Sequence, residues 1–203
     1  MAYLVPVLSS WLLTGILDHT PVQSAYSNAC LSKRFVAHNN DTCVLPWTPL
    51  VRILCFTSTT PAGELVAVFH DAAHKIVARF SREAVRRFEL RYGQRLTYET
   101  NARLMVLRHA SLRFVGGQER ADFARALASM GARNADVALV YLDVDEVDFY
   151  VRDRISLPVL AEHALVPLYK DAEYVERFRK SSPADVAYND GLISDEESLP
   201  NPD

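Results

Sequence analysis

Three short segments rich in β-branched and aromatic residues follow one another in the chain, and turn residues separate them. The segments run from Leu50 to Phe56, from Glu64 to Phe69 and from Lys75 to Phe80. The sequences between them are Pro-Ala-Gly at 61–63 and His-Asp-Ala-Ala-His at 70–74. Runs of this length and composition, separated by Gly, Pro and Asp, are typical of strands joined by tight turns. The segments therefore predict consecutive antiparallel strands.

The rest of the chain alternates between helical and strand patterns. Ser81 is suited to cap a helix that Gly93 ends, and Gly131 ends a second helix. Residues 18–48 are predicted to be irregular because they are rich in Asn, Ser, Asp and Pro. No glycine-rich phosphate loop is present, so a nucleotide-binding α/β sheet is not indicated. We predict a mainly β protein, a small closed or partly open barrel with inserted helices and a C-terminal helix. The later elements are a strand at 104–115, a helix at 118–130, a strand at 137–151 and a helix at 160–178 with an interruption at Pro167.

Charge is distributed unevenly along the 203 residues. The region 182–203 contains six of the 25 acids and no Lys or Arg, and it is predicted to be a disordered acidic tail. The remaining 19 acids and 22 basic residues give residues 1–181 a mildly basic balance, which falls short of a dedicated duplex-DNA binder. Length favours one domain, over 1–181. The acids of the tail are Asp185, Asp190, Asp195, Glu196, Glu197 and Asp203.

Several patterns that suggest catalysis or metal binding fail on inspection. The pair His70 and His74 resembles a zinc-protease motif, but that motif requires a helix and these histidines lie between strand segments. The acids at 143–148 lack the glycine of a calcium loop and alternate with apolar residues, as on a half-exposed strand. Cys30, Cys43 and Cys55 form no CxxC pair. We therefore expect no enzymatic activity, no metal and no cofactor.

Membrane insertion is also not indicated. The apolar stretch from Tyr3 to Leu17 has no preceding basic region and contains Pro6 and Gly15, which disfavours a signal peptide. No apolar run reaches the roughly 18 residues of a membrane span.

One concentration of arginines favours a contact with nucleic acid. It spans 82–113, and Phe88, Tyr92 and Tyr98 are interleaved with it. OB domains bind single strands with such a mixture of cations and stacking rings, although about half of these arginines belong on the solvated face of one helix. A weak contact with single-stranded nucleic acid is therefore a secondary hypothesis.

Residues 69–89 (FHDAAHKIVARFSREAVRRFE), 93–101 (GQRLTYETN) and 104–107 (LMVL) carry a resemblance to a known family. They closely resemble the telomerase accessory subunit named for the ever-shorter-telomeres phenotype, the third of its series. More distantly, they resemble the OB domain of the shelterin subunit that recruits telomerase in mammals. The shared pattern is an Asp turn followed by His, an alternating strand, a Ser-x-Glu helix start, a Phe-Glu pair and an apolar strand. The resemblance is dense over 65–115 and returns at Trp11 and at 149–157.

The resemblance implies an OB fold, a five-stranded barrel with inserted helices and a C-terminal helix. It also implies a non-catalytic subunit that binds the telomerase catalytic protein and other holoenzyme proteins, without a small-molecule substrate or a membrane. It would act in the nucleus, at the telomeric region of chromosomes. An alternative is a shelterin component that bridges telomerase and a single-strand telomere-binding protein. The partner-binding positions that it implies are Trp11, Arg52, Asp71, Glu99, Arg103 and Asp153.

Each of these positions also has a purely structural interpretation. Trp11 suits a core position near a chain end, and Asp71 suits a turn. On the binding hypothesis we expect Asp71→Arg to abolish partner binding without unfolding the barrel. The acids that follow the helix in the mammalian domain are replaced here by Leu90, Arg91 and Tyr92, so that contact patch is not carried over.

Overall fold

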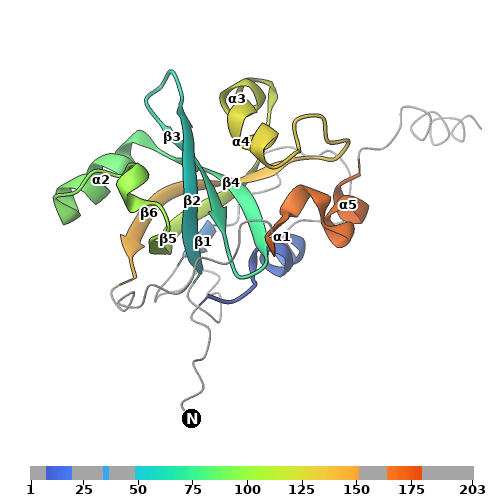
Figure 1. The fold of residues 1–203 in the computed structure, drawn as a ribbon, viewed down its shortest axis with the longest axis horizontal. Helices are drawn as coiled ribbons and strands as arrows, with labels where there is room; N and C mark the ends of the chain where they lie inside the picture. Colours follow the sequence, from blue (N-terminus) through green and yellow to red (C-terminus); the bar gives the residue numbers. More distant parts are fainter. Residues whose placement is uncertain (1–7, 20–33, 37–48, 151–163, 180–203) are drawn as a thin grey trace, which may run out of the picture.

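Five strands close into a barrel (Figure 1). The computed structural model describes residues 8–19, 34–36, 49–150 and 164–179. Antiparallel pairing joins β5 to β2, β2 to β3 and β3 to β4; β4 and β6 pair in parallel, and β6 returns to β5 as an antiparallel neighbour. This order closes the sheet on itself, as an OB fold requires. The barrel strands are β2 (Leu50–Thr59), β3 (Leu65–His70), β4 (His74–Phe80), β5 (Leu104–Phe114) and β6 (Val140–Phe149).

Helices and short strands cover the barrel. In Figure 1, α2 lies at the left of the barrel, α1 and α5 lie at the lower right, and α3 and α4 lie above them. Among the described residues, no helix is long and apolar enough to cross a membrane. The covering elements are α1 (Leu12–His19), β1 (Arg34–Val36), α2 (Arg82–Tyr92), η2 (Tyr98–Thr100), α3 (Gly117–Asp122), α4 (Ala124–Ser129), β7 (Val166–Pro167), η4 (Leu168–Lys170) and α5 (Ala172–Phe178).

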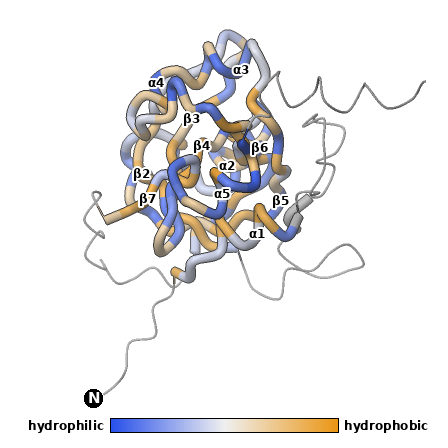
Figure 2. Tube along the Cα trace, turned by 90° about the vertical axis from the view of Figure 1, so that its right-hand side faces the viewer, coloured by the Kyte–Doolittle hydropathy of each residue, from blue (hydrophilic) through white to orange (hydrophobic). Residues whose placement is uncertain are grey.

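The core fills the barrel interior and the space beneath the helices. On one face of the sheet Phe69 and Phe80 meet edge to face, with ring centroids 5.3 Å apart. The outer face is covered too: Tyr174 is fully buried, and its hydroxyl donates to the Ala138 carbonyl at 2.8 Å. Hydrophobic stretches therefore follow the strands, while α3 is mostly hydrophilic (Figure 2). Because both faces are covered, most strand residues are buried without strict alternation.

Local sequence signals place several boundaries correctly. The Ser81 hydroxyl accepts from the Ala84 amide at 3.1 Å, and Gly93 adopts φ 61° with its N–H on the Glu89 carbonyl. These contacts confirm the predicted start and end of α2. The hairpin turn at 61–63 and the turn at 71–73 are also where the sequence predicts them.

Three predictions about the covering elements are wrong in part. Residues 18–48 are not wholly irregular, since α1 extends to His19 and β1 pairs with β5. The helix predicted at 118–130 is interrupted at Phe123, which is buried and packs on Tyr141. Of the helix predicted at 160–178, the described part from 164 onward forms an α-helix only from Ala172, because Pro167 lies in β7 and the Asp171 side chain caps α5. The predicted acidic tail lies outside the described residues.

Candidate functional site

Asp71 is fully buried in the turn between β3 and β4, where its carboxylate accepts four backbone N–H groups. One oxygen, Oδ2, accepts from Trp11 and Leu12 at 2.6 and 2.7 Å, at the start of α1. The other, Oδ1, accepts from Ala73 and His74 at 2.8 and 2.7 Å. Asp71 therefore both closes the turn and caps a helix that lies sixty residues away in the sequence.

These contacts change what we expect of the Asp71→Arg substitution. A carboxylate without solvent exposure has no surface with which to contact a partner in this conformation. An arginine at this position would bury a positive charge in place of the carboxylate, and the four backbone N–H groups would lose their acceptor. Asp71→Arg is therefore expected to disrupt folding, contrary to the expectation that it would spare the barrel. These contacts support the turn interpretation of Asp71, while its part in partner binding stays a prediction.

Trp11 is also buried, at 2 % exposure. Its indole N–H donates to the Leu50 carbonyl at 2.8 Å, where β2 begins. The ring thus packs α1 against the barrel, and the structural interpretation of Trp11 holds in this conformation.

Arg52, on β2, connects the buried region to the surface. It is 7 % exposed, and its guanidinium donates to the carbonyl of Ala102. Ala102 has a φ of 61°, which is unfavourable for a residue with a Cβ, and its N–H donates to the Ile53 carbonyl at 2.7 Å. Arg52 and β2 therefore hold the segment before β5 in a conformation that it would not adopt alone. Trp11, Arg52 and Asp71 are named the buried group below.

The exposed family positions lie on that segment. Glu99 belongs to η2 and is exposed, and Arg103 is exposed with its guanidinium 5.0 Å from the centre of the Phe149 ring. Tyr98, beside Glu99, is 75 % exposed. Solvated aromatic side chains next to charges of both signs are typical of protein-binding surfaces. Tyr98, Glu99 and Arg103 are named the η2 surface below.

The structure thus divides the predicted positions into two sets. The buried group meets at one end of β2, and the segment that it supports carries Glu99 and Arg103. Asp153 lies outside the described residues. The sequence predicts Tyr98 only as a ring on which nucleic acid could stack. Because Tyr98 directly precedes the family position Glu99, the sequence could also have indicated a protein-binding surface here.

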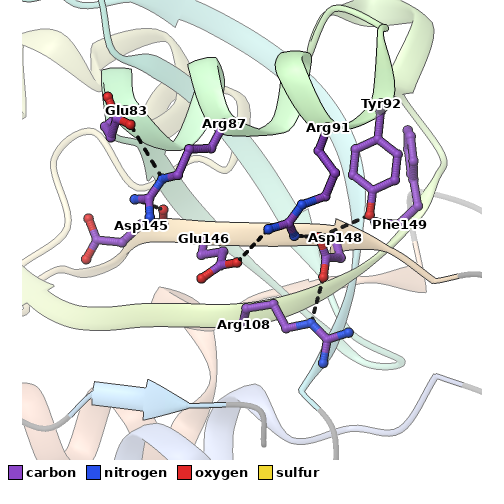
Figure 3. A network of polar contacts seen from close by, with 9 residues as sticks. All are labelled: Glu83, Arg87, Arg91, Tyr92, Arg108, Asp145, Glu146, Asp148 and Phe149. Atoms are coloured by element: carbon purple, nitrogen blue, oxygen red, sulfur yellow. Dashed lines mark hydrogen bonds and ion pairs between the residues drawn. The ribbon is translucent and has the colours of Figure 1, made fainter.

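A network of charges on α2 and β6 changes the interpretation of the arginine concentration (Figure 3). On α2, Arg87 lies 3.8 Å from Glu83 and donates to the Asp145 carbonyl at 2.9 Å. One turn later, Arg91 lies 3.1 Å from Glu146 and also pairs with Asp148. These arginines bind acids of the same chain, so their positive charge is largely compensated.

Asp148 is the centre of this network. It accepts from Arg108 Nε at 2.8 Å and from the Tyr92 hydroxyl at 3.0 Å, besides its pairing with Arg91. Partial burial opposes ionisation, but the hydrogen bonds from the two arginines and the tyrosine outweigh it and lower the pKa of Asp148. Burial, and then the contact with Asp148, raises the pKa of Tyr92. The sequence predicts a half-exposed strand for Asp148. It does not predict the partners of this side chain, because they come from two distant elements, α2 and β5.

The predicted stacking platform is mostly occupied. Phe88, Tyr92 and Phe149 pack on one another with ring centroids 4.8 to 4.9 Å apart. Only Tyr98 of the three predicted rings is exposed. Among the predicted rings, Phe88 and Tyr92 thus offer little surface on which a base could stack.

The two histidines of the zinc-protease-like pattern, His70 and His74, each contact an aspartate. His70 lies in β3 at 1 % exposure and its Nδ1 is 2.7 Å from the Asp71 carbonyl; burial lowers its pKa. His74 begins β4, and its Nε2 is 3.2 Å from Asp171 Oδ2, the side chain that caps α5. Within the described ranges, no group of three His, Cys, Asp or Glu side chains could hold a metal ion.

The acids of the calcium-like run belong to a strand, as predicted. Asp143, on β6, forms two hydrogen bonds of 3.0 Å with Arg79 and lies 2.7 Å from Arg113. Its neighbours Leu142 and Val144 are buried. The run thus supplies ion pairs on the outside of the barrel.

Comparisons with known proteins give the family. Residues 8–165 match the model of the shelterin complex subunit TPP1/ACD. The telomere replication protein EST3 of Debaryomyces hansenii is 31 % identical over 178 residues, which cover 87 % of this chain and 83 % of the relative. The protein of the same name in Candida albicans is 32 % identical over 174 residues, 84 % of this chain and 78 % of that one.

A solved structure agrees in fold. The Est3 telomerase subunit of the yeast Hansenula polymorpha superposes with a TM-score of 0.57 at 16 % identity, over 90 % of this chain and 92 % of that one. The likeness at this identity concerns the fold, and it confirms the predicted OB barrel. Sequence and fold together lead to one conclusion: this chain belongs to the family of the telomere replication protein EST3, which the shelterin subunit model TPP1/ACD also matches.

Proposed function

We propose that this chain is a non-catalytic accessory subunit of telomerase, and that it binds telomerase protein through the η2 surface. Its family members are named for telomere replication, and a chain of the same fold is named as a telomerase subunit. The protein would therefore act in telomere maintenance, in the nucleus and at the telomeric region of chromosomes.

The exposure of Tyr98 beside Glu99 and Arg103 is the observation that carries this proposal. Of the five family positions that the structure describes, only Glu99 and Arg103 are free to touch a partner surface. The exposed ring would supply much of the affinity, while charges of both signs would select the partner and orient it. The buried group would act indirectly, by holding the η2 segment against β2.

The test compares the binding of the purified telomerase catalytic protein by the wild type and two charge reversals, Glu99→Arg and Arg103→Glu. The matched controls are Glu176→Arg on α5 and Arg133→Glu after α4, which reverse exposed charges elsewhere. We expect each η2 variant to bind at least about tenfold more weakly and each control to bind as the wild type does. Equal binding by all five proteins would refute docking at this surface.

A shelterin bridging component is the second candidate, and the match to the shelterin subunit model favours it. In that case the chain would hold telomerase and a single-strand telomere-binding protein at once. Addition of that purified protein to the binding assay separates the two functions. An accessory subunit retains telomerase protein without it, whereas a bridge forms a three-protein complex in which both contacts are direct.

Nucleic acid would contribute little to this function. Of the arginines at 82–113, four have no ion pair with an acid among the described residues: Arg82, Arg86, Arg95 and Arg103. These four remain for a weak contact with telomeric DNA or telomerase RNA. Such a contact would weaken steeply as the salt concentration rises.

A further inference from the structure

A pocket of about 250 Å³ opens between the β2–β3 turn and α3. Thr60 and Glu64 line it from the turn, Arg79 from β4, and Gln118, Glu119 and Asp122 from α3. In Figure 1 the tip of the β2–β3 hairpin and α3 both lie at the top of the barrel.

The position of this pocket is the one at which OB folds bind ligands. The β2–β3 turn joins the first two barrel strands, and α3 belongs to the connection between the last two. The corresponding loops bind oligonucleotides and oligosaccharides in many OB folds. The pocket is also distinct from the η2 surface: Thr60 directly follows β2, whereas Arg52 lies near the start of β2, about 25 Å away along an extended strand.

The charge of this pocket is wrong for a nucleic acid. Its lining contains three carboxylates, those of Glu64, Glu119 and Asp122, and one guanidinium, that of Arg79. Arg79 is already held by Asp143 through two hydrogen bonds of 3.0 Å and lies 3.5 Å from Glu64. Within the described part of the chain, neither Glu119 nor Asp122 has an ion pair. The net negative charge would repel phosphate and attract a cation.

A buried tyrosine packs its ring beneath one residue of the pocket lining, although it does not line the pocket itself. Tyr141 is fully buried, the Arg79 guanidinium covers its ring at 5.2 Å, and its hydroxyl has no hydrogen-bond partner among the described residues. Burial raises the pKa of Tyr141; the charge of Arg79 opposes this shift, and those of Asp143 and Glu119 add to it. The ring of Tyr141 thus lies under Arg79, and its buried hydroxyl lacks an acceptor or donor among the described residues.

We propose that this pocket binds an arginine or lysine side chain of a protein partner, at the position where other OB folds hold nucleic acid. Glu119 and Asp122 line the pocket and are partly exposed, and their carboxylates have no ion pair among the described residues. A guanidinium or ammonium group supplies several donors to such carboxylates. The partner segment is basic, and its contact is independent of the η2 surface.

The test is a titration of the ¹⁵N-labelled chain with the peptide acetyl-Gly-Arg-Gly-Arg-Gly-amide at low salt, followed by amide chemical shifts. A peptide with citrulline in place of each arginine has the same shape without the charge. We expect the arginine peptide to shift the amides of Thr60, Gln118, Glu119 and Asp122, and the citrulline peptide to leave them unchanged.

Two double variants complete the test. Glu119→Gln with Asp122→Asn removes two pocket charges, whereas Glu83→Gln with Asp136→Asn removes two exposed charges elsewhere. We expect the pocket variant to bind the arginine peptide at least about fivefold more weakly and the other variant to bind it unchanged.

Three results would overturn the proposal: equal affinity of a folded pocket variant, equal binding of the citrulline peptide, or shifts of the pocket amides by a deca-thymidylate oligonucleotide. The last result would make the pocket a nucleic-acid site. Because Glu99→Arg leaves the pocket intact, that variant should bind the peptide normally, so this proposal and the η2 docking proposal fail independently.

Discussion

The buried group and the η2 surface differ in environment although their positions correspond to the same family pattern. Asp71, Trp11 and Arg52 are at most 7 % exposed, and hydrogen bonds join each of them to backbone groups. Glu99 and Arg103 are exposed, and Tyr98 is more exposed still. A loss of function at a buried position would report the support of the η2 segment, whereas a loss at the η2 surface would report the contact itself.

The largest effect on stability is expected for Asp71→Asn. The substitution keeps one acceptor, loses the charge and directs an NH₂ group at backbone donors, so the free energy of unfolding should fall by about 3 kcal/mol. Urea unfolding measures it, with Asp145→Asn as the control, because the Asp145 side chain is 40 % exposed. A fall no greater than that of the control would contradict the buried role of Asp71.

Trp11→Phe should have the next largest effect. The variant loses the hydrogen bond to the Leu50 carbonyl and part of the buried ring, which together cost about 2 kcal/mol. Hydrogen exchange of the α1 amides should accelerate more than that of the β5 amides, because the contact joins α1 to the barrel. Uniform acceleration would mean that α1 unfolds only with the whole barrel.

Asp148→Asn tests the network that supports α2 beside the η2 segment. Most of its partners are partly exposed, so a loss of about 1 kcal/mol is expected at low salt, and it should shrink as salt is added. The pKa of Asp148 is lowered in the folded state, so its contribution is present above the ordinary value of 3.8 and is lost as the pH falls through the folded pKa. Thermal unfolding from pH 7 to pH 2 should show this loss in the wild type and less of it in the variant.

Tyr98→Ser should have the smallest effect on stability. The ring is 75 % exposed, so the free energy of unfolding should change by less than about 0.5 kcal/mol. Binding of telomerase protein should nevertheless weaken, because an exposed aromatic ring contributes to affinity only in the complex. A stable variant with full binding would remove Tyr98 from the proposed contact.

Sequence patterns predict those features whose causes are local. The cap at Ser81, the left-handed turn at Gly93 and the turn that contains Asp71 depend on neighbours within a few residues, and all are found. The barrel itself follows from short strands and tight turns, once the family resemblance supplies their order.

Features that depend on distant partners could not be predicted in this way. The burial of Asp71 depends on α1, which reaches it from sixty residues away, and the burial of Arg52 involves a carbonyl fifty residues away. The helix break at Phe123 follows from packing on Tyr141. Residue type alone cannot distinguish a buried aspartate that caps a helix from an exposed one that binds a partner.

The central claim is that the η2 surface touches telomerase protein, and site-specific photo-crosslinking tests it most directly. A photoreactive phenylalanine derivative would replace Tyr98 in one variant and the exposed Ala128 of α4 in another, each in assembled telomerase. The account predicts a crosslink to a telomerase protein from position 98 and none from position 128. A crosslink from position 128 alone would contradict it.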